Sequence, residues 1–212
     1  VALPIYFEAI NEANKMYGLI KKGFDLVEDN PEFLFTTGLY NYFRIMYPQK
    51  HPIFAPIAIF FKKGDKELGL EQMVMSTEKA VISQIVAAIY LSYIYFRYDQ
   101  TPEKAFGLLQ NLLTTYPTNY YLLYQFLEAA YATGHYDQIL PLIVNTLINT
   151  DRTYYKIIGY ILRAAYLEFV EKESNDAYIY YGMGVGFGNE ILNHGEYFKS
   201  VGYLGLARLS QQ

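Results

Sequence analysis

Three histidines are the residues of this sequence best suited to metal binding. His51, His135 and His194 lie in three different connectors or helix ends, and no HExxH or paired Glu-x-x-His motif accompanies them. Glu190 and His194 are four residues apart and share one face of any helix that holds both, but two ligands alone do not make a site. The sequence therefore predicts no metal site and no bound cofactor.

The run GMGVGFG (Gly182 to Gly188) invites comparison with nucleotide-binding loops. Its alternating glycines do not fit G-x-G-x-x-G, no strand is predicted before it, and no Gly-Lys-Ser/Thr follows it. We expect a flexible hinge here, which would let Asn189 start the final helix or would allow close approach of another backbone. The few serines are scattered and none lies in a G-x-S-x-G elbow, so the chain is not expected to be an enzyme.

The composition describes a well-packed, tyrosine-rich chain. Hydrophobic residues make up 52% of the 212 residues, with 24 Tyr, 14 Phe and no Cys, which excludes disulfides and thiolate metal sites. The net charge is −4 and no basic block interleaves with aromatics as a phosphate-binding face would require, so nucleic acid is not the expected partner.

No transmembrane helix is expected, although peripheral membrane association stays open. The uncharged run of 17 residues between Lys79 and Arg97 is at the lower margin for spanning a bilayer and is better interpreted as a buried helix. The chain starts at Val1, so a signal peptide or lipid anchor could precede it. A cytoplasmic and an exported location, periplasmic or outer-membrane associated, both remain possible, and the oligomeric state is not specified.

Helix-breaking residues divide the chain into apolar helical stretches, and two helix starts are especially clear. Asn30-Pro31-Glu32 and Thr101-Pro102-Glu103 each place a capping side chain before a Pro at the first helical position and then an acid. Short connectors between the stretches predict antiparallel neighbours. The predicted helices are about 3–29, 31–47, 64–77, 79–98, 102–115, 119–133, 136–149, 151–172, 175–182 and 189–210, which make five antiparallel pairs.

Apolar positions repeat when the chain is shifted by 34 residues, so that Tyr90 falls on Tyr124 and Leu109 on Ile143. The stretches YIYFRYDQTPEKAFGLLQNLLTTYP and YQFLEAAYATGHYDQILPLIVNTL resemble successive tetratricopeptide repeats, with Pro117 closing the first unit. Tyr93 and Leu127 stand where the family has small residues in the first helix. A divergent unit further upstream, interrupted by an insertion, resembles bacterial tetratricopeptide proteins, which are often exported.

The resemblance implies an all-α fold, a right-handed α-α superhelix of antiparallel helix pairs. The whole chain, 1–212, would form a single helical-repeat domain. Its clearest repeats would be 85–118 and 119–152, with divergent units at 31–78 and 151–212. In the family, the first helices of the pairs line a concave groove that binds a protein or peptide segment, so the chain is expected to be an interaction scaffold or adaptor.

The residues independently suggest a contact set on three predicted first helices. On each helix, residues at the spacing i, i+4, i+7 lie on the face next to the core-facing positions. Several of them are Tyr or Arg, the residue types that binding hot spots favour. Packing between helices is the alternative role for these tyrosines. The candidates are Tyr90 and Arg97; Tyr124, Glu128 and Tyr131; and Lys156, Tyr160 and Arg163.

The insertion PQKHPIFAPIAIFF, from Pro48 to Phe61, is apolar and has a proline at every fourth residue from Pro48 to Pro56, which disfavours a continuous helix. One interpretation is a connector that packs on the helices. The other is an apolar lip at a groove or an interface with a partner or a membrane. The alternative to a protein-binding scaffold is a small-ligand or lipid binding protein whose pocket is covered by this insertion.

Overall fold

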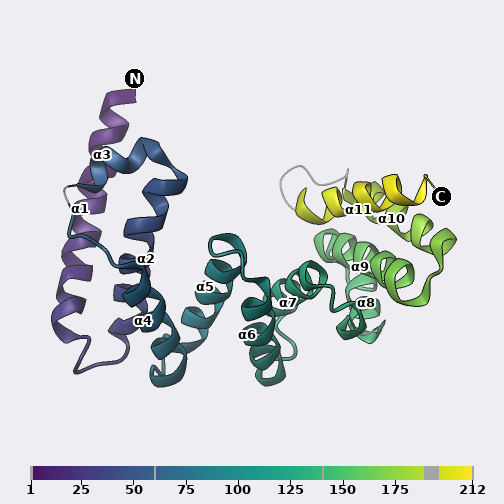
Figure 1. Ribbon diagram of the computed structural model, residues 1–212, viewed down its shortest axis with the longest axis horizontal. Coiled ribbons are helices and arrows are strands. Elements are labelled where there is room, and N and C mark those ends of the chain that lie inside the picture. The colour runs from purple at the N-terminus through teal and green to yellow at the C-terminus, as the bar shows by residue number, and fades with distance from the viewer. Residues whose placement is uncertain (1, 60, 140, 189–195, 212) are drawn as a thin grey trace. The chain divides into compact units, whose positions relative to one another are not determined.

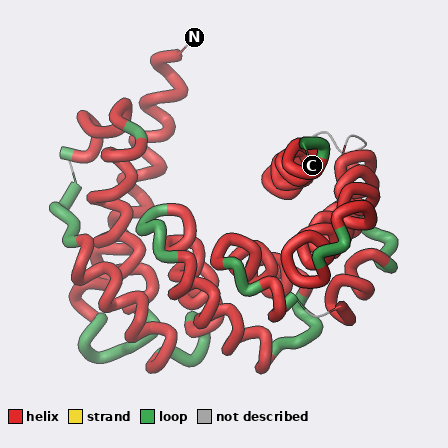
Figure 2. The backbone as a smooth tube through the Cα atoms, turned by 45° about the vertical axis from the view of Figure 1, so that its right-hand side comes forward, coloured by secondary structure: helices red, strands yellow, loops and turns green. Residues whose placement is uncertain are grey.

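The structure, a computed structural model, describes residues 2–59, 61–139, 141–188 and 196–211. Within these ranges the chain is all-α and contains no strand, as Figure 2 shows, and the helices pack in sequential antiparallel pairs. Both features confirm the predicted fold class at this level.

The helices follow one another through short connectors (Figure 1). Two 3₁₀ turns and one π-helical turn are included below under the label η. In chain order the elements are α1 (Ala2–Leu26), α2 (Phe33–Lys50), η1 (Pro52–Phe54), α3 (Ala55–Ala58), α4 (Lys66–Lys79), α5 (Gln84–Arg97), α6 (Pro102–Thr115), α7 (Tyr120–Thr133), η2 (Tyr136–Gln138), α8 (Pro141–Ile148), α9 (Thr153–Tyr166), η3 (Leu167–Glu171), α10 (Ser174–Gly188) and α11 (Glu196–Leu209).

The chain divides into two compact units, residues 1–108 and 109–212. In the first unit α1 packs on α2, α2 on α4 and α4 on α5. Its core contains Tyr42, Met73, Ala87, Leu91 and Ile94. The Tyr42 hydroxyl of α2 donates a hydrogen bond of 2.8 Å to Asp99, which also pairs with Lys66 of α4 at 2.8 Å. These polar contacts tie the end of α5 to α2 and α4.

Helix α9 is the centre of the second unit. It contacts α7, α8, α10 and α11, and three of its isoleucines, Ile157, Ile158 and Ile161, are almost fully buried. Tyr181 of α10 and Phe198 of α11 are fully buried as well. The opposite side of α9, with Lys156, Tyr160 and Arg163, is only partly buried, as expected for an amphipathic helix.

The predicted helix starts agree with the structure to within a few residues. Helix α6 begins at Pro102, and the Asn30 side chain accepts a hydrogen bond from the Glu32 backbone N–H just before α2. Helix α2 continues through Pro48 to Lys50, three residues past its predicted end. The predicted helix 79–98 starts only at Gln84, because the Glu32 carboxylate, just before α2, holds residues 81–83 in a connector.

The predicted hinge at Gly182–Gly188 is wrong, because these residues form the second half of α10. A Cβ on Gly184 would lie 2.6 Å from the Ile161 side chain, whereas Gly182 and Gly186 have open space around their Cα atoms. A buried glycine here lets α10 approach α9 closely, and that contact stabilises the helix against the low helix propensity of glycine. The predicted start of the last helix at Asn189 lies outside the described residues.

The connector between α4 and α5 is held by Glu32, a residue 49 to 51 positions earlier in the chain. The Glu32 carboxylate accepts hydrogen bonds from the backbone N–H groups of Val81 at 2.7 Å, Ile82 at 2.9 Å and Ser83 at 2.8 Å. These backbone bonds, first of all the one from Ile82, lower the pKa of Glu32 to about 2. Glu32 thus binds a distant loop, in addition to its expected place at the start of α2.

Glu32→Gln is expected to destabilise the first unit at neutral pH, because the amide oxygen is a weaker acceptor than the carboxylate and the amide NH₂ accepts nothing. The pKa of Glu32 is lower in the folded protein than its ordinary value of 4.5. The contribution of its carboxylate to the free energy of unfolding is therefore fully present above that ordinary pKa. The contribution is lost as the pH falls toward about 2.

Urea unfolding of the wild type and of Glu32→Gln over a pH series would measure the difference between their free energies of unfolding. It should shrink steadily below the ordinary carboxyl pKa. The exposed Glu78→Gln variant is the control and should match the wild type throughout. A difference between wild type and Glu32→Gln that stays constant into acid would contradict the carboxylate's role.

Candidate functional site

The two candidates on α5 lie in the first unit and are exposed. Tyr90 is 43% exposed, and the edge of its ring meets Phe35 at 5.6 Å between centroids. The Arg97 guanidinium lies 4.7 Å from the centre of the Phe96 ring, and the Arg97 carbonyl accepts a hydrogen bond from Lys50. Both side chains are therefore placed at the surface, where a partner could contact them.

The three candidates on α7 are more enclosed. Glu128 is only 6% exposed. Tyr124 is partly buried, with its ring 5.7 Å from Tyr154 and 5.8 Å from Phe198. Tyr131 is also partly buried, lies 5.7 Å from the Tyr136 ring, and has a raised pKa, mainly because of its burial. These side chains serve contacts between helices of the second unit.

The α9 candidates are likewise engaged in contacts within the second unit. The Tyr160 ring stacks on Phe187 of α10 at 5.4 Å. Arg163 pairs with Glu171 at 3.6 Å, and its guanidinium lies 5.6 Å from the Tyr166 ring. Lys156 is partly buried. The i, i+4, i+7 spacing thus places residues on one side of each helix, but their exposure differs from helix to helix.

The first unit carries a surface that the sequence analysis found only in part. Four tyrosines from two helices form it, and we call them the aromatic band: Tyr47 of α2, Tyr90 and Tyr93 of α5, and Tyr98 just after α5. Tyr47, Tyr90 and Tyr93 are exposed. The Tyr98 ring lies 5.9 Å from the Tyr93 ring, and its pKa is raised first by burial and then by Tyr93 and Tyr47.

Cations flank the aromatic band. The Lys50 ammonium lies 4.3 Å from the centre of the Tyr98 ring and donates to the Arg97 carbonyl at 2.6 Å. Tyr98 packs edge-on against Phe43 at 5.1 Å, which fixes it to the core of the unit. The band is therefore a surface of tyrosine rings, anchored to the core at Tyr98, with positive charge at its edge. Sequence reasoning missed Tyr47 and Tyr98 because α2 and α5 meet only in the folded unit.

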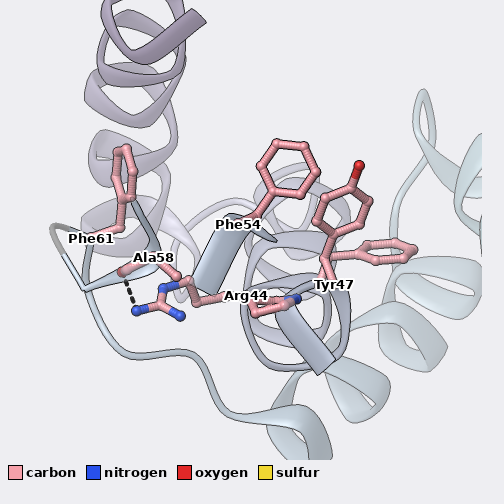
Figure 3. A pocket seen from close by; sticks show the side chains of 7 residues that line it. Arg44, Tyr47, Phe54, Ala58 and Phe61 are labelled. Atoms are coloured by element: carbon pink, nitrogen blue, oxygen red, sulfur yellow. Dashed lines mark hydrogen bonds between the residues drawn. The ribbon is translucent and has the colours of Figure 1, made fainter. Parts of the chain in front are cut away.

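A pocket of about 180 Å³ lies next to the aromatic band, between α2 and the insertion (Figure 3). Its walls are almost entirely apolar. The Arg44 guanidinium donates a hydrogen bond to the Ala58 carbonyl and so ties the insertion to α2. The lining residues are Phe43, Arg44, Tyr47, Pro48, Phe54, Ala58 and Phe61.

Among the described residues, no three His, Asp or Glu side chains lie together in a way that could hold a metal ion. The pair Glu190 and His194 lies outside those residues. Within the same part of the chain, no helix combines the length and the apolar character that crossing a bilayer requires.

Comparison of the chain with protein-family models, with curated proteins and with solved structures gives no match. The fold and the site together define an all-helical protein of sequential antiparallel pairs that exposes an aromatic surface in its first unit.

Proposed function

We propose that this chain is a non-catalytic protein-binding module of the tetratricopeptide kind, a scaffold or adaptor that holds a segment of a partner protein. In this proposal its helix pairs stack as a right-handed α-α superhelix, and the first helix of each pair lines a concave groove. The sequential antiparallel pairs and the 34-residue repetition of apolar positions support the proposal.

The aromatic band is the observation that carries the binding function. Exposed tyrosines next to Arg97 match the composition of binding hot spots, because rigid rings supply a large contact area at a small cost in conformational entropy. The band lies on α2 and α5, which are the predicted first helices of two successive units. A protein segment that crosses these helices would cover the band.

A small apolar ligand is the second candidate, and the pocket beneath the insertion favours it. Pro48, Phe54, Ala58 and Phe61 of the insertion are among the walls of the pocket. Its volume of about 180 Å³ is below the roughly 300–1,000 Å³ typical of small-molecule sites. That size suits one large apolar side chain of a bound segment better than a whole ligand.

Peptides selected from a displayed random library against the protein are expected to bind through the aromatic band. Tyr90→Ala/Tyr93→Ala should weaken their binding about thirtyfold, which corresponds to a hot-spot loss of about 2 kcal/mol. Titration calorimetry would measure the affinities. The control is Tyr178→Ala/Tyr203→Ala, which removes two equally exposed tyrosines from the second unit and should leave binding intact. Equal losses in both variants, or no selected peptide at all, would overturn the proposal.

A further inference from the structure

The part of the chain from Phe33 to Gly64 carries a charge opposite to that of the whole protein. It contains Arg44, Lys50, Lys62 and Lys63 and no Asp or Glu, whereas the entire chain has a net charge of −4. Three of these four cations lie at the two ends of residues 50–63. This stretch overlaps the insertion, and we call it the lysine-flanked segment. A local excess of positive charge on an acidic protein attracts an anionic surface.

The lysine-flanked segment exposes large aliphatic side chains between its lysines. Ile53 in η1 is 67% exposed, and Ile59 just after α3 is 74% exposed. Phe54 and both prolines of the segment are exposed too. Isolated exposed aliphatics are common on protein surfaces, but several within one short stretch mark an interaction site.

Within the part of the chain that the structure describes, none of these lysines forms an ion pair with a carboxylate. The Lys62 ammonium lies 4.1 Å from the centre of the Phe24 ring, and the Lys50 ammonium lies over the Tyr98 ring. Lys63 is exposed. Rings hold these cations without cancelling their charge, so the positive potential of the segment reaches the solvent.

The segment is anchored to the helices on either side. The Tyr40 hydroxyl donates to the Lys62 carbonyl at 2.6 Å, and the Lys62 backbone N–H donates to the Tyr17 hydroxyl at 3.2 Å. The Phe61 ring meets Tyr17 edge-on at 5.2 Å between centroids. With both ends tied down, Ile53 and Ile59 are presented at the surface and not covered by the unit itself.

We propose that the lysine-flanked segment docks this protein on a membrane surface that contains anionic lipids. Ile53 and Ile59 would enter the boundary between headgroups and acyl chains, while Lys62, Lys63 and Lys50 would contact the lipid phosphates. A protein partner fits this segment less well, because lysine is depleted at protein interfaces and enriched at lipid surfaces. The proposal uses other residues than the aromatic band and stands without it.

Co-sedimentation with vesicles tests the proposal. The protein is expected to bind vesicles of phosphatidylglycerol mixed with phosphatidylcholine, and to bind pure phosphatidylcholine far more weakly. Lys62→Glu/Lys63→Glu should weaken binding by at least about thirtyfold, since each lysine near an anionic surface contributes about a fivefold gain. Ile53→Ser/Ile59→Ser should weaken binding to the same vesicles at unchanged charge.

Two variants serve as matched controls. Lys21→Glu/Lys22→Glu makes the same charge change at exposed positions of α1, and Val81→Ser/Ile82→Ser removes exposed aliphatics from another connector. Both should bind like the wild type, and circular dichroism should show all four variants to be equally helical. Equal binding by Lys62→Glu/Lys63→Glu and Lys21→Glu/Lys22→Glu would overturn the proposal. Failure to bind the mixed vesicles would do the same and would leave a protein as the occupant of the segment.

Discussion

Gly69→Ala is expected to lower the free energy of unfolding of the first unit by about 2 kcal/mol. The new Cβ would lie 2.5 Å from the Tyr42 backbone nitrogen and 2.8 Å from the Gly38 carbonyl oxygen. Backbone atoms of α2 cannot rotate away as a side chain can, so α2 and α4 must separate. Overpacking of this kind costs about 3 kcal/mol, and the better helix propensity of alanine offsets about 1 kcal/mol.

Gly107→Ala in α6 is the matched control for this prediction. A Cβ on Gly107 meets nothing within 4 Å, so only the gain in helix propensity remains. That variant should be more stable than the wild type by up to about 1 kcal/mol. Urea unfolding followed by circular dichroism would measure both changes. Equal stabilisation by the two substitutions would show that α2 and α4 do not approach as closely as the structure indicates.

Glu168→Leu is expected to destabilise the second unit by about 3 kcal/mol. The Glu168 carboxylate accepts two hydrogen bonds from Arg208, at 2.9 and 2.8 Å, and one from the Tyr181 hydroxyl at 2.7 Å. Tyr181 is fully buried, and its pKa is raised first by that burial and then by Glu168. Removal of the acceptor leaves both donors without their partner, which costs about 3–5 kcal/mol when the pair is fully buried.

The Arg208 side chain is 40% exposed, which brings the expected loss to the lower end of that range because water can solvate part of the guanidinium. Glu171→Leu is the matched control, since Glu171 lies in the same π-helical turn η3 and pairs with Arg163 at 3.6 Å. That pair is partly exposed and should contribute less than about 1 kcal/mol. Equal urea midpoints for the two variants would contradict the role given to Glu168.

The candidate contact set shows which part of site prediction a sequence supports. Helical spacing correctly placed Tyr124, Glu128 and Tyr131 along one helix, because that spacing is a local property of the chain. Whether a given side of a helix meets solvent depends on neighbours that the spacing does not reveal. Glu128 is buried and Tyr124 packs on Phe198, whereas Tyr90 at the corresponding place on α5 is exposed.

The sequence by itself determined the helical class, most helix positions and the sequential pairing, because capping side chains, prolines and apolar periodicity act within a few residues of one another. Asn30 and Pro102 are examples. Only the tertiary structure decided the features that depend on distant contacts. It kept Gly182–Gly188 helical through the approach of Gly184 to Ile161, and it brought Glu32 to the connector before α5. Long-range burial and hydrogen bonding override local propensity in these places, since their free energies exceed the differences between local conformations.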